Sequence, residues 1–241
     1  MLERLAGEIP RFFTLPKLVL LLEAMGTTLA MTVIGCVLGF LLAFGIVFLR
    51  QTPGRLALPI RLAAILYVEI FRRIPFLVVI YLVLFFIQAF VSDASLFAIA
   101  VIAICIYSTA YTADIIRGGF ESVARQQTEA AAAMNFSRWQ TLVSVIVPQS
   151  WPVILPPAVA FAVGFIKDTA LVSQVGVFEL TFRGKELNNE GFSGLLVFGT
   201  IAFLYFAMSY PLSRWGRWLE QRLASSPSKR PQQRLRPADR P

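Results

Sequence analysis

The sequence predicts an all-α integral membrane protein with about five transmembrane helices, and three observations support this. Of the 241 residues, 57% are hydrophobic and 15% are charged, whereas soluble domains average roughly 45–50% apolar and about 25% charged residues. Apolar runs long enough to cross a bilayer recur along the chain. The basic residues behind the net charge of +8 stand mainly at the ends of those runs, which indicates membrane orientation rather than nucleic-acid binding.

The apolar runs define the elements in chain order. The first is interrupted only by Glu23, and the second is broken by Arg72, Arg73 and Pro75. The fourth apolar run reaches the adjacent pair Lys167 and Asp168 and then continues. The five predicted spans cover residues 18–49, 57–91, 96–116, 151–177 and 194–213.

The distribution of lysine and arginine predicts the orientation. With five spans the two termini lie on opposite sides of the membrane. One side then carries five basic residues and the other fourteen, if the three within or beside spans (Arg72, Arg73 and Lys167) are left out. The basic side is cytoplasmic, so we expect the N-terminus outside and the C-terminus inside. Residues 1–224 then form the membrane domain, and the Pro-, Gln- and Arg-rich residues 225–241 are expected to be a disordered cytoplasmic tail.

Histidine is absent, and the two cysteines, Cys36 and Cys105, stand in separate apolar runs. These features argue against imidazole catalysis, a thiolate metal site and a disulfide framework. We therefore expect no metal and no cofactor bound by this chain. The chain also lacks a G-x-x-x-x-G-K-[ST] phosphate loop.

One long cytoplasmic segment, residues 121–148, separates the third and fourth spans. Residues 129–134 are strong helix formers, and Asn135 can adopt the left-handed conformation that ends a helix. Ser137 and Gln140 have the spacing of a capping box, which starts a second helix. Pro148 is expected to end that helix, because proline cannot donate to the helical ladder. The segment therefore predicts helix, sharp turn, helix, although an ordinary surface loop explains the composition equally well.

This segment resembles the cytoplasmic signature of bacterial binding-protein-dependent ABC importer permeases. The signature reads E-A-A, three residues, Gly, nine residues, then I-x-L-P. Glu129, Ala130 and Ala131 match its start and Pro148 its end, while Asn135 stands in place of the glycine. The resemblance implies that this loop docks into a groove on a separate ATPase subunit and transmits its motion.

Three further segments resemble the polar amino acid permeases within that family: YVEIFRRIPFLV (67–78), YTADIIRGGFESV (111–123) and FIKDTALVSQVGVFEL (165–180). Together the matches cover most of residues 60–185 in the family order. The resemblance implies a permease subunit in the bacterial cytoplasmic (inner) membrane that is not itself an enzyme. It also implies a pair of cytoplasmic ATP-binding subunits, a second permease chain, an external solute-binding protein and a polar amino acid as substrate.

Ionisable residues at membrane depth are costly and are therefore candidates for the substrate path. They are Glu69, Arg72, Lys167 and Asp168, with Thr169 beside them. A zwitterionic substrate needs a cation for its carboxylate and an anion or carbonyls for its ammonium group. Structural salt bridges remain an alternative: Glu69 and Arg73 have the i,i+4 spacing of a helical pair, as Asp114 and Arg117 have the i,i+3 spacing.

Two other functions are compatible with parts of the sequence. An intramembrane enzyme could use Asp114 and Asp168 as an acid–base pair, but no surrounding hydrolase motif is present. A stand-alone secondary transporter is disfavoured because no internal repeat is evident. Finally, Gly35, Gly39 and Ala43 recur every four residues in the first span, which predicts a close helix contact, expected within the subunit rather than across a dimer.

Overall fold

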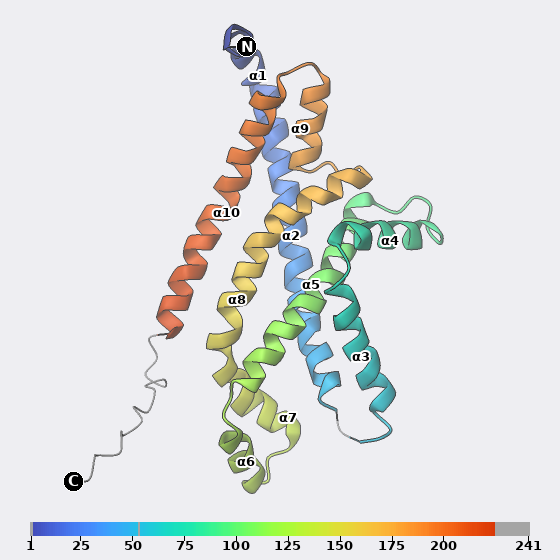
Figure 1. Cartoon of the computed structure of the whole chain (residues 1–241), viewed down its shortest axis with the longest axis vertical. Helices are drawn as coiled ribbons and strands as arrows, with labels where there is room; N and C mark the ends of the chain where they lie inside the picture. Colours follow the sequence, from blue (N-terminus) through green and yellow to red (C-terminus); the bar gives the residue numbers. More distant parts are fainter. Residues whose placement is uncertain (1, 53, 225–241) are drawn as a thin grey trace, which may run out of the picture.

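The computed structural model describes residues 2–52 and 54–224, with side chains described for residues 7–52 and 54–223. The described chain is a bundle of helices, and it contains no strand (Figure 1). The predicted tail, residues 225–241, lies outside the described residues. The elements are α1 (Leu2–Phe12), α2 (Leu15–Arg50), α3 (Leu58–Phe71), α4 (Phe76–Gln88), α5 (Leu96–Glu121), α6 (Arg125–Ala133), α7 (Arg138–Thr141), the π-helical turn η1 (Leu142–Ile146), α8 (Val147–Asp168), the 3-10 helix η2 (Thr169–Val175), α9 (Leu180–Asn189) and α10 (Gly194–Ala224).

The predicted helical membrane fold is confirmed. Four helices of the described chain are long and apolar enough to cross a bilayer: α2, α5, the segment Arg138–Val175 and α10. A fifth crossing is reached if α3 and α4 count as one span. The helices extend past the predicted limits in three places: α5 continues to Glu121, the fourth candidate span begins at Arg138 instead of residue 151, and α10 continues past residue 213 to Ala224. Its last turns carry both tryptophan and arginine and extend the apolar helix as an amphipathic one.

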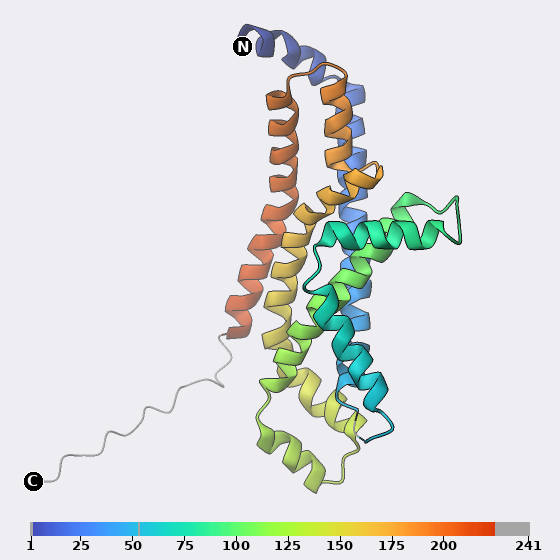
Figure 2. The same cartoon turned by 45° about the vertical axis from the view of Figure 1, so that its right-hand side comes forward.

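The second span is broken where the sequence predicts, but it is not one crossing helix. The direction of the chain bends by 118° between α3 and α4, and α4 projects sideways from the bundle (Figure 2). Pro75 causes the break between α3 and α4. It has no N–H to donate to the helical hydrogen-bond ladder, and it disfavours the helical conformation at the preceding residue, Ile74. Residues 57–91 therefore form two helices with a sharp bend between them, and they count as one span only if this bent pair crosses the membrane together.

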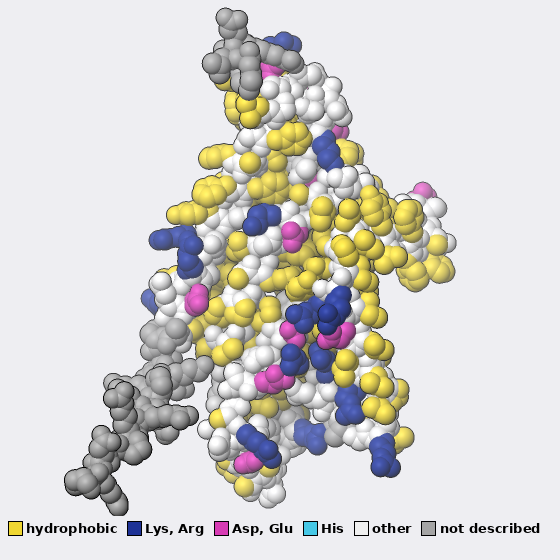
Figure 3. Space-filling model, viewed as in Figure 1, with side chains coloured by type: hydrophobic (Ala, Val, Ile, Leu, Met, Phe, Trp, Pro, Cys, Tyr) yellow, Lys and Arg dark blue, Asp and Glu magenta, His cyan; other side chains and the backbone are white. Residues whose placement is uncertain are grey.

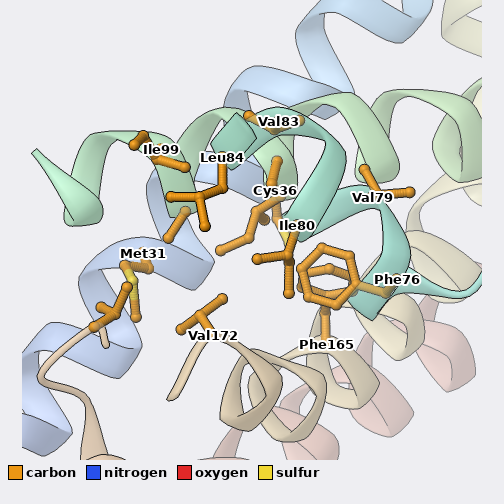
Figure 4. Close-up of a cluster of buried hydrophobic side chains, with 14 residues drawn as sticks. Met31, Cys36, Phe76, Val79, Ile80, Val83, Leu84, Ile99, Phe165 and Val172 are labelled. Carbon is orange, nitrogen blue, oxygen red and sulfur yellow. The ribbon is translucent and has the colours of Figure 1, made fainter. Parts of the chain in front are cut away.

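Helix α4 closes one core with its inner face. Its five buried residues pack against α2, α5, α8 and η2, as the side chains in Figure 4 show. Phe165 of α8 meets Phe76 at a ring-centroid distance of 4.8 Å. The opposite face of α4 is exposed and apolar at Val78, Leu82 and Phe85. A helix that is apolar on all sides is typical of burial in protein or lipid.

The centre of the bundle is the contact between α2 and α5. A Cβ on Gly35 would collide with Ile104, and one on Gly39 would collide with Ser108. Ser108 Oγ donates a hydrogen bond of 3.0 Å to the carbonyl oxygen of Gly35. The small-residue stripe therefore packs within the subunit, as expected from the sequence, and it allows the two helix backbones to approach closely.

Helix α1 was not predicted as an element, and it covers one end of the bundle beside the turn that joins α9 to α10. Phe12 is 1% exposed and belongs to the core at that end. Glu8 accepts a hydrogen bond of 2.7 Å from the backbone N–H of Ser193. The α6–α7 segment lies at the opposite end of the molecule (Figures 1 and 2). The two ends of the bundle are therefore formed by different segments of the chain.

The buried carboxyl group of Glu179 holds α9 at the end of the bundle where α1 lies. Glu179 is fully buried, and its two carboxylate oxygens accept hydrogen bonds from the Phe182 N–H (2.8 Å) and the Tyr205 hydroxyl (2.8 Å). Burial raises the pKa of the Glu179 carboxyl above its ordinary value of 4.5, although these hydrogen bonds and the nearby Lys185 oppose the shift. The side chain thus links α9 to α10 most favourably in its neutral form.

This arrangement predicts a pH-dependent stability. Because the pKa of Glu179 is raised on folding, its contribution is fully favourable below the unfolded pKa and is lost as pH rises through the folded pKa. We expect Glu179→Gln to remove this component, so that its melting temperature at pH 8 equals or exceeds that of the wild type. Glu179→Ala should melt lower at every pH, because it leaves the Phe182 N–H unpaired. Thermal unfolding in detergent between pH 4 and 8 measures this, with the exposed Glu190→Gln as control; an unchanged pH dependence in Glu179→Gln would contradict it.

Candidate functional site: the elbow and the charge cluster

The segment from Arg125 to Thr141, here called the elbow, consists of α6, a sharp turn and α7. Helix α6 forms from strong helix formers, and Arg125 Nε binds Glu129 Oε1 at 2.8 Å, one helical turn apart. Both side chains are exposed, at 89% and 61%, so this pair contributes only a few tenths of a kcal/mol. The Glu129 carboxylate is therefore accessible at the surface of the elbow.

Asn135 ends α6 in the left-handed conformation, as predicted. Its φ of 59° is the only positive φ of a non-glycine residue in the described part of the chain. The Phe136 N–H donates to the Ala131 carbonyl (3.0 Å) and the Asn135 N–H to the Ala132 carbonyl (3.0 Å). These two bonds form the Schellman motif, which satisfies the last carbonyls of a helix. Asparagine thus performs here the backbone role that glycine has in the signature.

The capping box that starts the second helix is also confirmed. The Gln140 N–H donates to Ser137 Oγ at 3.2 Å, and the Ser137 N–H donates to Gln140 Oε1 at 2.8 Å. The Trp139 ring lies edge-on to Phe48 at the end of α2, with 5.8 Å between centroids. The elbow is therefore shaped by its own backbone contacts and is held against the bundle by an aromatic pair.

The expectation that Pro148 ends the second helix is wrong. The helix runs on from α7 through η1 into α8, and Pro148 stands in the first turn of α8. The π-helical turn at Leu142–Ile146 explains this, because it shifts the hydrogen-bond register just before a residue that has no N–H to donate. One continuous helical segment thus joins the elbow to the membrane.

The four alanines of α6 are not equally accessible. Ala131 is 4% exposed and faces its own chain, whereas Ala130, Ala132 and Ala133 are exposed. The expected low-bulk surface therefore consists of three alanines with Glu129 beside them. Ala131 instead sets the spacing between α6 and the helix that follows the turn.

The second candidate site is a cluster of charges where α3 meets α5, visible as mixed basic and acidic side chains in Figure 3. Arg72 binds Asp114 at 2.9 Å, and Arg117 binds the other oxygen of Asp114 at 2.8 Å. Arg117 also binds Glu121 at 2.7 Å. The expected Asp114–Arg117 pair is thus part of a larger network. Because arginine side chains engage both oxygens of Asp114, the structure offers no free Asp114 oxygen for the acid–base role considered above.

Glu69 belongs to a separate pair. Arg73 Nη2 lies 2.6 Å from Glu69 Oε2 along the exposed side of α3. This is the helical pairing that the i,i+4 spacing allowed as the alternative to substrate contact. The structure therefore does not bring Glu69 into the Arg72–Asp114 network.

Lys167 and Asp168 end α8 with exposed side chains, and neither forms a salt bridge with another described residue. Thr169, in contrast, is fully buried and donates a hydrogen bond of 2.6 Å to the Ile166 carbonyl. Thr169 thus stabilises the change from α8 to η2, and its hydroxyl does not face an open surface. Of the three, only the two charged residues are available to a ligand.

Two tyrosines that the sequence analysis missed connect the two groups of charges. Tyr107 and Tyr111 lie one turn apart on α5, with ring centroids 4.8 Å apart and hydroxyl oxygens 3.1 Å apart. The Arg72 guanidinium carbon lies 5.6 Å from the Tyr111 ring centroid, and the Tyr107 ring lies 5.8 Å from the ring of Phe165, three residues before Asp168 on α8. Phe161 of α8 stacks on Tyr111 at 5.4 Å.

The result is an aromatic surface with a cation at one end and a carboxylate at the other. The signal in the sequence was the i,i+4 spacing of aromatic residues on two neighbouring spans, at residues 107 and 111 and at residues 161 and 165. That spacing places the rings on one helix face. It does not reveal that the two faces meet. We call these residues, Arg72, Tyr107, Tyr111, Phe161 and Asp168, the aromatic–charge site.

A bundle of helices long and apolar enough to cross a bilayer, with a cluster of charges in its middle part and a structured elbow at one end, is an architecture that suits a membrane permease. Comparison with known proteins identifies the family. Residues 35–225 match the model of the binding-protein-dependent transport system inner membrane component, and the chain belongs to this family. The resemblance stated from the sequence is thereby confirmed.

Curated relatives and a solved structure agree with this assignment. The chain is 32% identical over 210 residues to the glutamine transport system permease protein GlnP of Escherichia coli strain K12, covering 86% of this chain and 94% of the relative. It is 32% identical over 197 residues to the L-cystine transport system permease protein TcyB of Bacillus subtilis strain 168, covering 81% and 83%. A crystal structure of an amino acid ABC transporter with histidines matches with a TM-score of 0.76 and 28% identity, over 84% of this chain and 94% of that one.

Proposed function

We propose that this chain is the permease subunit of an ATP-driven importer for polar amino acids in the bacterial inner membrane. Its family is that of binding-protein-dependent transport components, and relatives that match over most of their length are permeases for glutamine and cystine. ATP hydrolysis belongs to a separate pair of cytoplasmic subunits. A second permease chain completes the path, and an external binding protein delivers the substrate.

The elbow is the coupling element of this importer. The observation that carries the assignment is the exposed Glu129 beside three low-bulk alanines on α6, in an elbow whose second helix, α7, continues through η1 into α8. A displacement of the elbow by the ATPase is therefore passed directly to a membrane helix. Alternating access then requires the bundle to move around the substrate path. With the N-terminus outside and the C-terminus inside, the elbow and the end of α10 are cytoplasmic, and α1 and α9 are outside.

The aromatic–charge site is the proposed substrate contact. Arg72 would receive the α-carboxylate of an amino acid, and Asp168 would receive its ammonium group. In the Arg72 network, Arg72 and Arg117 are balanced by Asp114 and Glu121, and the separate Arg73–Glu69 pair is neutral as well. Such a neutral environment suits a zwitterion better than a substrate with a net charge. Lys167 and Thr169 act beside this contact, the first as a second exposed cation and the second as a support for the α8–η2 junction.

Uptake measurements on two variants test this site. We expect Asp168→Asn and Arg72→Gln each to raise the KM for amino-acid uptake by roughly 10- to 100-fold, the loss of one charged hydrogen bond. Asp168 is the cleaner test because it forms no salt bridge with another described residue. Arg55→Gln, an exposed position between α2 and α3, controls for the loss of a basic charge. Unchanged KM values in both variants, in a complex that still couples ATP hydrolysis to uptake, would contradict the site and leave the coupling element intact.

A further inference from the structure

Two tyrosine hydroxyls link α3 and α5, and they donate in opposite directions. Tyr67 of α3 donates a hydrogen bond of 2.6 Å to the Ile106 carbonyl of α5. Tyr111 of α5 donates one of 3.2 Å to the carbonyl of Arg72, the residue that follows the last residue of α3. The second bond therefore holds the main chain of the residue that is the proposed contact for the substrate carboxylate.

The Arg72 carbonyl needs a donor from outside its own helix. The last carbonyls of an α-helix have no intrahelical partner, and the residue three positions on, Pro75, has no N–H to offer. Among the described residues, no backbone N–H donates to the Arg72 carbonyl. An unpaired carbonyl inside a bilayer is costly. The Tyr111 hydroxyl thus satisfies the end of α3 at the bend before α4.

The Arg72 side chain lies against the same part of α5. Its guanidinium carbon is 5.6 Å from the Tyr111 ring centroid, and its Nη1 binds Asp114 at 2.9 Å. Tyr111 and Asp114 are three residues apart and so share one face of their helix. This face of α5 therefore holds both the backbone and the side chain of Arg72.

The Arg72 guanidinium keeps donors that its protein contacts do not use. Asp114 engages Nη1, whereas Nε has no hydrogen-bond partner among the described residues. The side chain is 36% exposed. An arginine presents its donors as a planar fork of fixed geometry, so a carboxylate meets them only if the plane is held in the right direction. The direction in which Arg72 is held therefore matters for the proposed contact.

The Tyr111 side chain is itself fixed from two sides. Tyr107 donates a hydrogen bond of 3.1 Å to its hydroxyl oxygen. The Phe161 ring of α8 stacks on the Tyr111 ring, with 21° between the ring planes and 5.4 Å between centroids. Tyr111 thus lies where α3, α5 and α8 meet, and it has a contact with each of them.

We propose that Tyr111 is a positioning residue for substrate binding: its hydroxyl fixes the main chain of Arg72 and its ring supports the guanidinium. A binding group keeps its affinity only when neighbouring side chains hold it in the productive geometry. This inference rests on the proposed substrate contact at Arg72. It adds that Tyr111 acts on the substrate through Arg72.

Equilibrium binding to the purified complex of permease and ATPase, without the binding protein, tests this role at the membrane site. The probes are radiolabelled L-glutamine, L-glutamate, L-cystine, L-histidine and L-arginine, and the one that the wild type binds most tightly is used throughout. We expect Tyr111→Phe, which removes the hydroxyl and keeps the ring, to raise the Kd by about 3- to 10-fold, the loss of one neutral hydrogen bond.

Tyr67→Phe is the matched control, because it removes the other hydroxyl bond between α3 and α5. Its Kd should stay within about twofold of the wild type. If Tyr111→Phe leaves the Kd unchanged, or if both variants raise it equally, the positioning role is overturned. In the second case the two hydroxyls only hold α3 against α5.

A double-variant cycle shows whether Tyr111 acts through Arg72. In the Arg72→Gln background, Tyr111→Phe should change the Kd by less than about twofold, because two residues that serve one contact are not additive. A further loss of about 3- to 10-fold in that background would overturn the inference. Wild-type affinity in Arg72→Gln alone would instead refute the substrate contact at Arg72. A wild type that binds none of the five probes would overturn the contact and the inference together.

Discussion

Glu129→Lys should abolish substrate uptake while ATP hydrolysis by the partner subunits continues. Glu129 is exposed on α6 and forms a weak surface ion pair with Arg125. This pair leaves the carboxylate accessible to another subunit. Reversing its charge at a protein interface costs several kcal/mol. We therefore expect uptake in reconstituted vesicles to fall by about 100-fold. The reversed charge also stands one turn from Arg125, but that repulsion costs only about 0.2–0.5 kcal/mol of helix stability.

A control separates the two roles of Glu129. Arg125→Gln breaks the same surface pair and leaves the Glu129 carboxylate in place, so uptake should remain within about twofold of the wild type. If Glu129→Lys transports at the wild-type rate, the elbow does not couple this permease to an ATPase. If Arg125→Gln fails as severely as Glu129→Lys, the essential feature is the α6 ion pair and not a contact with a partner.

Gly39→Val should prevent stable folding of the bundle. A Cβ at Gly39 would collide with Ser108 Oγ, and it would lie 3.0 Å from the Cys105 carbonyl oxygen, a backbone atom that cannot rotate away. The α2–α5 contact would have to open, which also breaks the Ser108–Gly35 hydrogen bond. Overpacking of this kind costs roughly 1–3 kcal/mol and sometimes more. We expect a large loss of monodisperse protein and a lower melting temperature in detergent.

Gly45→Val is the matched control for this prediction. Gly45 lies on the same helix, and a Cβ there meets no atom within 4 Å. The intrinsic change in helix propensity is the same at both positions. Equal yield and melting temperature for Gly39→Val and Gly45→Val would show that close approach of α2 and α5 does not hold the bundle together.

Local sequence signals predicted the elbow well because its geometry depends on neighbouring residues. The left-handed Asn135 and the capping box of Ser137 and Gln140 both form between positions a few residues apart. Pro148 does not mark the end of a helix because proline is also compatible with the first turn of one. A π-helical turn upstream, which no residue pattern announces, made that position available.

Contacts between distant segments were harder to predict. Hydropathy located the break at Pro75, but it carries no information about the direction in which α4 leaves, which is set by the packing of α4 against α5 and η2. Arg72 was identified as costly at membrane depth, yet its partners Asp114 and Tyr111 lie about forty residues away on another helix. Neither hydrophobic periodicity nor charge spacing specifies which helix faces meet, so the aromatic–charge site emerged only from the structure.

Cysteine cross-linking between the elbow and the ATPase subunit tests the central claim most directly. With the native cysteines, Cys36 and Cys105, replaced by serine, a single cysteine at Ala130 should form a disulfide with a cysteine series in the ATPase, and the yield should change when nucleotide binds. A cysteine at Leu195, exposed near the start of α10 at the opposite end, should form none. Cross-links from Leu195 and none from Ala130, in a complex that transports, would contradict the account.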